Sequence, residues 1–197
     1  YYPIEKFMSR YTDDLITITE EDYKLAKDRN FKGNIHHVHG VGVNTDKFVK
    51  LSEEDRQKLR LDKGYTDEFI ILCTGELNKN KNQATLIEAM KDVVKKRPEA
   101  KLLLAGNGPE HDNLVKLIED LNLGDNVELL GYRTDIQDYV NICDLVVSAS
   151  HREGLPLIIM EAMICGKPVI ASDNRGHREL IKNNENLINF KIIFNYY

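Results

Sequence analysis

The stretch from Asp144 to Asp173, DLVVSASHREGLPLIIMEAMICGKPVIASD, decides the fold. It begins with an apolar run that is typical of a buried strand, and it continues through a loop into an apolar helical segment near Pro156. A second apolar run follows Gly166. Proline is tolerated in the first turn of a helix, and glycine is common directly after the last turn. The stretch therefore predicts a strand–helix–strand unit, the building block of parallel α/β sheets.

The same alternation of short apolar runs and helical stretches extends along most of the 197 residues. The expected strands are Leu15–Ile18, Ile35–His39, Phe69–Cys73, Lys101–Ala105, Val127–Leu130, Asp144–Ser148 and Pro168–Ala171. The expected helices are Glu20–Asn30, Ser52–Lys63, Asn82–Arg97, Glu110–Asn122, Ile136–Ile142, Leu157–Cys165 and His177–Lys182. We therefore predict an α/β fold in which helices flank a Rossmann-like parallel sheet.

A hydrophilic stretch over residues 50–68 interrupts this alternation and suggests a domain boundary. We assign residues 1–49 to the tail of a preceding domain and its link, and residues 50–182 to the main domain. Residues 183–197 are Asn-rich and then aromatic, so we expect an atypical end there. The sequence begins with tyrosine and not with an initiator methionine, and we therefore expect it to be a piece of a longer protein.

Composition excludes several classes of function. The net charge of −5 argues against a nucleic-acid partner, which would require a basic face. No apolar run approaches the ~20 residues that span a bilayer. Cys73, Cys143 and Cys165 lie in apolar sequence without a Cys-x-x-Cys pair, so we expect buried free thiols in a reducing compartment such as the cytoplasm.

Two loops at the expected carboxyl ends of strands, where parallel sheets bind ligands, carry glycine or charge. In the first, Gly75 allows a turn, and Lys79 and Lys81 precede a helix whose N-terminus favours an anion. In the second, Gly106 and Gly108 permit a phosphate or base to approach the backbone closely. Solvated loop lysines and a plain tight turn explain the same residues, so neither loop decides the function alone.

The loop before the helix in the opening stretch carries Glu153, and Glu161 follows eight residues later inside that helix. Neither carboxylate is needed by the local structure. Amides at the helix start would donate to a phosphate there, and they belong to Gly154, Leu155 and Leu157. Carboxylates that accept from sugar hydroxyls, beside phosphate donors, suit a nucleotide sugar. The alternative is that Glu161 pairs with a nearby cation or faces solvent.

Three runs, TGELNKNKNQATLIEAM, LLLAGNGPEHDNL and VELLGYRTDIQDYVNICDLVVSASHREGLPLIIMEAMICGKPVIASD, resemble the C-terminal domain of retaining group 1 (family 4) glycosyltransferases of the GT-B fold. The bacterial exopolysaccharide and capsule enzymes are the most similar type. The resemblance covers Phe69–Ile181 and centres on the Glu-x7-Glu pattern of Glu153 and Glu161. Residues 13–48 resemble the last strand and helix of the N-terminal domain with its link.

The resemblance implies a role for each of these positions. Glu161 would bind the ribose hydroxyls, Glu153 would contact the donor sugar, and Lys81 would bind the pyrophosphate. The amides of Gly154, Leu155 and Leu157 would line the sugar–phosphate region, and Gly75, Gly106, Gly108 and Arg133 would lie in loops around the donor. Glu76 stands where the family commonly has arginine, which leaves Lys79 or a residue from outside this chain to supply that charge.

The implied whole enzyme is a hexosyltransferase-type enzyme that moves a sugar from a UDP- or GDP-sugar to a polysaccharide or lipid-linked acceptor, with retention. The resemblance implies no cofactor and no metal, and it places peripheral membrane contact in the domain that is absent here. His37 and His39 share a strand face, but we expect them to be structural. This piece alone is not expected to transfer sugar. Two alternatives stay open, a non-catalytic nucleotide-binding fragment of a truncated gene and a GT-B sugar epimerase.

Overall fold

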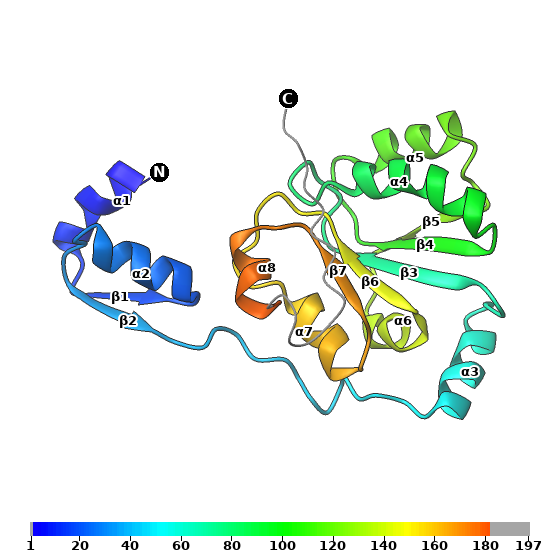
Figure 1. Ribbon diagram of the computed structural model, residues 1–197, viewed down its shortest axis with the longest axis horizontal. Coiled ribbons are helices and arrows are strands. Elements are labelled where there is room, and N and C mark those ends of the chain that lie inside the picture. Colours follow the sequence, from blue (N-terminus) through cyan, green and yellow to red (C-terminus); the bar gives the residue numbers. More distant parts are fainter. Residues whose placement is uncertain (1, 182–197) are drawn as a thin grey trace.

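Two parallel sheets form the framework of the computed structural model, which describes residues 2–181 (Figure 1). The larger sheet has five strands in the order β5-β4-β3-β6-β7, and each strand is parallel to its neighbours. Its strands are β3 (Phe69–Thr74), β4 (Ala100–Ala105), β5 (Val127–Gly131), β6 (Leu145–Ser148) and β7 (Val169–Ala171). The predicted Rossmann-like α/β fold is therefore confirmed.

Helices cover both faces of the five-stranded sheet. They are α3 (Glu53–Asp62), α4 (Gln83–Lys96), α5 (His111–Asp120), α6 (Ile136–Ile142), α7 (Leu157–Ile164) and α8 (Arg175–Leu180). Helices α4 and α5 lie on one face, and α3, α6 and α7 lie on the other (Figure 1). No helix in the described residues combines the length and apolar character that crossing a membrane requires.

The core consists of two apolar clusters, one on each face of this sheet. On β3, Ile70 and Leu72 belong to the cluster that includes α6 and α7, whereas Ile71 and Cys73 belong to the cluster under α4 and α5. Successive side chains of a strand point to opposite faces, so a strand covered on both sides must be apolar throughout. All three cysteines are buried and free, as predicted.

A smaller N-terminal unit precedes the large sheet. It contains α1 (Tyr2–Met8), a 3-10 turn η1 (Ser9–Tyr11), β1 (Asp14–Thr17), α2 (Glu20–Asp28) and β2 (Asn34–His37), with β1 parallel to β2. Figure 1 shows an extended link from β2 toward α3. Helix α2 contacts α8 through two ion pairs, Asp22–Arg175 at 2.5 Å and Glu21–Arg178 at 2.8 Å. The assignment of this unit to a separate domain stays a prediction.

The predicted strands and helices of the described chain are confirmed to within two residues at their ends. Helix α8 begins two residues earlier than expected because the Asn174 side chain accepts a hydrogen bond from the amide of His177 (3.1 Å) and so caps the helix. Helix α1 was not predicted. The atypical end predicted over residues 183–197, and Lys182, lie outside the described residues.

Candidate functional site

The order of the strands locates the site. The chain adds β4 and β5 on one side of β3 and then returns to add β6 and β7 on the other side. The strand order therefore reverses between β3 and β6. In open α/β sheets, ligands bind at the carboxyl ends of strands at such a switch point. The loop after β3 carries Lys81, and the loop after β6 carries Glu153, so the residues predicted to contact the pyrophosphate and the donor sugar meet at this point.

Hydrogen bonds join these two loops directly. The amide of His151 donates to the Asn80 carbonyl oxygen (2.8 Å), and the Asn80 side chain donates to the carbonyl oxygen of Arg152 (2.9 Å). The Asn82 side chain also donates to the Ala149 carbonyl oxygen (3.4 Å). A backbone amide and two asparagine side chains therefore hold the loops together, and the charged side chains are not required for this contact.

Lys81 and Glu153 form an ion pair across the two loops. The Lys81 Nζ atom lies 2.6 Å from Glu153 Oε1, and the side chains are 26% and 13% exposed. Lys81 is thus oriented and partly withdrawn from water, while about a quarter of its side chain stays exposed. Lys79, in the same loop, is exposed, and Glu76 accepts a hydrogen bond from Asn78 (2.8 Å).

The second motif carboxylate, Glu161, has a different environment. It lies on α7, where the other residues are apolar, and it is only partly exposed. Burial raises the pKa of Glu161, and the ammonium group of Lys47 in the link opposes this shift. Lys47 itself donates to the Thr134 carbonyl oxygen (3.3 Å). The structure therefore adds Lys47 to the surroundings of Glu161. The sequence did not identify Lys47, because it lies 114 residues before Glu161 in the chain.

The first backbone amides of α7 have no hydrogen-bond acceptor within the helix. The first amides of any helix have no intrahelical acceptor, and at α7 the N-cap residue Pro156 supplies no capping side chain. Leu157 is the first helical residue and is 43% exposed. A Cβ atom at Gly154 would meet nothing within 4 Å, whereas Leu155 packs against Gly40 of the link. The amides predicted to bind phosphate therefore lie in an open part of the surface.

On the opposite side of β3, glycines allow backbone segments to touch. A Cβ atom at Gly106 would lie 1.9 Å from the Gly75 carbonyl oxygen, and one at Gly108 would lie 2.3 Å from the Leu77 carbonyl oxygen. Gly75 has φ of +138°, and a Cβ atom there would lie 3.1 Å from Lys81 Cε. Loop packing alone thus requires glycine at 106 and 108, and their predicted contact with a donor stays a prediction.

Arg133 follows β5 and is held by its own loop. Its guanidinium group makes two hydrogen bonds to Asp135 (2.9 and 2.7 Å) and lies 5.0 Å above the Tyr139 ring. Arg133 and then Lys63 hold the pKa of Asp135 well below its usual range. The guanidinium group therefore stabilises the start of α6, and its place in a loop around the donor stays a prediction.

A cluster of buried polar side chains lies behind the Lys81–Glu153 pair. Its members are Ser148, Ser150, Ser172, Asn174 and His177. Ser172 Oγ and Asn174 Nδ2 both donate to the Ser150 carbonyl oxygen, at 2.6 and 2.9 Å. The cluster ties the ends of β6 and β7 to the start of α8. The sequence alone did not identify His177 as part of the site.

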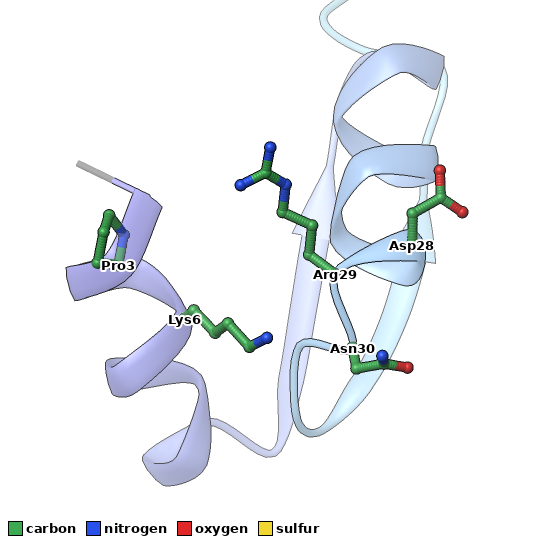
Figure 2. Close-up of a pocket in the computed structure, with 5 residues that line it drawn as sticks. All are labelled: Pro3, Lys6, Asp28, Arg29 and Asn30. Atoms are coloured by element: carbon green, nitrogen blue, oxygen red, sulfur yellow. The ribbon is translucent and has the colours of Figure 1, made fainter.

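Other polar groups lie apart from this site. His37, which we expected to be structural, lies 3.4 Å from Glu20 and packs against the rings of Tyr23 and His39. Within residues 2–181, no three His, Cys, Asp or Glu side chains are arranged to hold a metal ion. Figure 2 shows a pocket of the N-terminal unit, into which Lys6 of α1 and Arg29 after α2 extend, while Asp28 and Asn30 point away.

A sequence model of the family described as glycosyl transferases group 1 matches residues 52–191. The chain belongs to the group 1 glycosyltransferases. The match includes both loops of the switch point, so the Lys81–Glu153 pair and Glu161 lie within the part that defines this family assignment. The family part of the resemblance is thereby confirmed.

Named relatives of this group 1 glycosyltransferase support the assignment. It is 43% identical over 194 residues to the putative glycosyltransferase EpsD of Bacillus subtilis, covering 98% of this chain and 51% of EpsD. It is 35% identical over 163 residues to an N-acetylgalactosaminyltransferase of Campylobacter jejuni whose name includes diphospho-undecaprenol, covering 79% of this chain and 44% of that protein. The chain thus spans about half the length of the curated relatives it matches.

A solved structure supports the fold of this group 1 glycosyltransferase. HepE of Anabaena, in complex with UDP-glucose, superposes with a TM-score of 0.82 at 26% sequence identity. The superposition covers 96% of this chain and 53% of HepE. Together with the strand order, this similarity identifies the fold as that of GT-B glycosyltransferases, of which this chain forms about half.

Proposed function

We propose that this chain is the donor-binding half of a retaining hexosyltransferase that takes its sugar from a nucleoside diphosphate sugar. The observation that carries the proposal is the ion pair of Lys81 and Glu153 at the switch point. Lys81 Nζ lies 2.6 Å from Glu153 Oε1, so Glu153 orients the lysine side chain. A lysine that is held partly desolvated but not enclosed suits the binding of a diphosphate. The complex of HepE with UDP-glucose supports this class of ligand.

In the proposed complex, Lys81 and the first amides of α7 bind the diphosphate, because both present positive charge or donors at one place. Glu161 accepts hydrogen bonds from the ribose hydroxyls, and Glu153 contacts the donor sugar. Glu161 suits this role because burial disfavours its charge when no donor is present, and hydroxyl donors would compensate that cost. Positive groups placed before the reaction also stabilise the charge that develops on the departing diphosphate. The proposed chemistry uses no metal and no cofactor.

The acceptor of the whole enzyme is proposed to be a growing polysaccharide or a lipid-linked glycan of the exopolysaccharide type. The 43% identity to EpsD and the diphospho-undecaprenol in the name of the Campylobacter relative support this class. The acceptor would bind largely to the half of the protein that lies outside this chain. Peripheral contact with a membrane would likewise come from that half.

Calorimetric titration with UDP and with GDP tests the donor site directly. We expect saturable binding of one nucleotide and at least tenfold weaker binding by Glu161→Ala, which corresponds to about 1.4 kcal/mol. Glu54→Ala, at an exposed position of α3, is the matched control and should bind like the unchanged chain. A folded chain that binds neither nucleotide at millimolar concentration would overturn the proposal.

A further inference from the structure

The imidazole of His177 is buried behind the Lys81–Glu153 pair with one nitrogen unused. His177 is 2% exposed, and its Nδ1 lies 2.6 Å from the Ser172 carbonyl oxygen. Nδ1 also lies 3.0 Å from the side-chain nitrogen of Asn174. The contact with the Ser172 carbonyl oxygen is the shorter one, and a carbonyl oxygen only accepts hydrogen bonds, so we assign the proton of the neutral ring to Nδ1 and leave Nε2 as an acceptor. Nε2 is buried and has no partner among the described residues. A buried polar atom without a partner destabilises the fold and requires a physical explanation.

The start of α8 lies directly against the loop that carries Glu153. A Cβ atom at Gly176 would lie 2.7 Å from the Glu153 carbonyl oxygen and 2.6 Å from that of Gly154. Glycine is therefore required at this contact, and the backbone of α8 next to His177 packs against the backbone of the Glu153 loop. Ser172 and Asn174 hold His177 in the buried cluster, and the charges of Glu153 and Lys81 both act on its ring.

The charges around the ring act on its protonation. Burial lowers the pKa of His177 most, Glu153 and Asp173 raise it, and Lys81 lowers it. Asp173 is already paired with Arg178 at 2.8 Å. Cys73 lies on β3 beside the same pair, and burial raises the pKa of its thiol to about 12, so it stays uncharged near neutral pH. The ring is therefore neutral while Lys81 is paired with Glu153.

Binding of a diphosphate would change this balance. The Glu153 side chain is only 13% exposed, and Lys81 is its ion-pair partner. If Lys81 turns to the diphosphate, an uncompensated carboxylate remains in a poorly hydrated place, which is unfavourable. Among the described groups named above, Asp173 and Cys73 cannot become cationic, whereas the His177 ring is able to gain a positive charge.

We propose that His177 is the second partner of Glu153: when Lys81 turns to the diphosphate of a bound nucleotide, the His177 ring takes up one proton at Nε2 and donates it in a hydrogen bond to the Glu153 carboxylate. The proton comes from solvent, and no covalent bond to carbon, oxygen or phosphorus changes. His177 is thus a positioning residue that keeps Glu153 oriented toward the donor sugar. The inference rests on the proposed function, because it requires a diphosphate at Lys81.

Calorimetry in two buffers of different ionisation enthalpy tests the proton step. We expect UDP or GDP binding to take up protons, up to one per site at a pH near neutral, and to strengthen as the pH falls. His177→Asn, which retains an N–H for the Ser172 carbonyl oxygen, should abolish the uptake. His111→Asn, an exposed change on α5, is the control. Equal uptake in the unchanged chain and in a folded His177→Asn or His177→Gln variant would overturn the proposal.

A titration without nucleotide separates this inference from the proposed function. The pKa of His177, measured by NMR of its ring, should rise in Lys81→Met, because a cation is removed, and should fall in Glu153→Gln. These two shifts are expected whether or not the chain binds UDP. If neither variant moves the pKa of His177, the ring does not sense the pair and the proposal is overturned. Absence of nucleotide binding alone, with both shifts present, contradicts only the proposed function.

Discussion

The two sides of the site are held together by different kinds of contact. On the β4 side, backbone meets backbone, and Gly106 would place a Cβ atom 1.9 Å from the Gly75 carbonyl oxygen. On the β6 side, charged side chains meet, with Lys81 2.6 Å from Glu153. Loop packing dictates the residue type on the first side, whereas the hydrogen-bonded loops on the second side would stay together without these charges. Residues that packing does not require are therefore the better guide to function.

The largest loss of stability should come from disrupting the backbone contact between Gly106 and Gly75. Gly106→Ala places a Cβ atom against a carbonyl oxygen at a φ of +150°, so both contact and conformation are unfavourable. We expect the free energy of unfolding, measured in urea, to fall by about 3 kcal/mol. Gly124→Ala is the control, since a Cβ atom there meets nothing within 4 Å. Equal losses in both variants would show that the close approach to Gly75 is not what matters.

Removing the ion pair of Lys81 and Glu153 should destabilise the fold less. Lys81→Met leaves Glu153 without its ion-pair partner, and we expect a loss of about 1 kcal/mol, because Lys81 is partly exposed and water screens the pair. The double variant Lys81→Met with Glu153→Gln should recover most of this loss, because no unpaired charge remains. Urea unfolding of the four chains in a double-mutant cycle measures the coupling. A coupling near zero would mean that the pair does not hold Glu153.

Glu161 should show a change of the opposite sign. Because the pKa of Glu161 is raised in the folded chain, its stabilising contribution is present below the unfolded pKa and is lost as pH rises through the folded value. Glu161→Gln should therefore be neutral or stabilising, by less than about 1 kcal/mol, and more so at pH 7 than at pH 3. Thermal unfolding at both pH values tests this. A destabilised variant at pH 7 would indicate an unrecognised partner of the carboxylate.

The smallest effect is expected at Lys79. Its exposed side chain should contribute no more than about 0.5 kcal/mol to stability. A variant at this position nevertheless tests whether Lys79 or Lys81 supplies the positive charge for the diphosphate. The question arises because Glu76 stands where the resemblance implies arginine. We expect Lys79→Ala to weaken UDP or GDP binding less than Lys81→Ala does, in parallel calorimetric titrations. The reverse order would move the diphosphate toward the outer part of the loop.

Sequence patterns predicted the elements because each depends on local periodicity and on signals at helix ends such as Pro156 and Gly166. They also singled out Lys81, Glu153 and Glu161 as candidates, because these residues follow predicted strands or lie in the helix after one. Their roles stay predictions. Strand order is not local, so the switch point between β3 and β6 had to come from the structure. The same reason explains why His177 was missed. Its place behind Glu153 depends on Gly176 packing against a loop 22 residues away.

One side of helix α8 packs against the Glu153 loop, and another side forms ion pairs with α2 of the N-terminal unit. Its exposed ion pairs to Asp22 and Glu21 are of a kind that contributes little individually. The link from β2 to α3 makes them intramolecular, however, and a short tether gives the two surfaces a high effective concentration. Salt screens exposed charges but does not change the tether. Ionic strength should therefore change how strongly these ion pairs hold the N-terminal unit on α8, while the link keeps the two surfaces near each other.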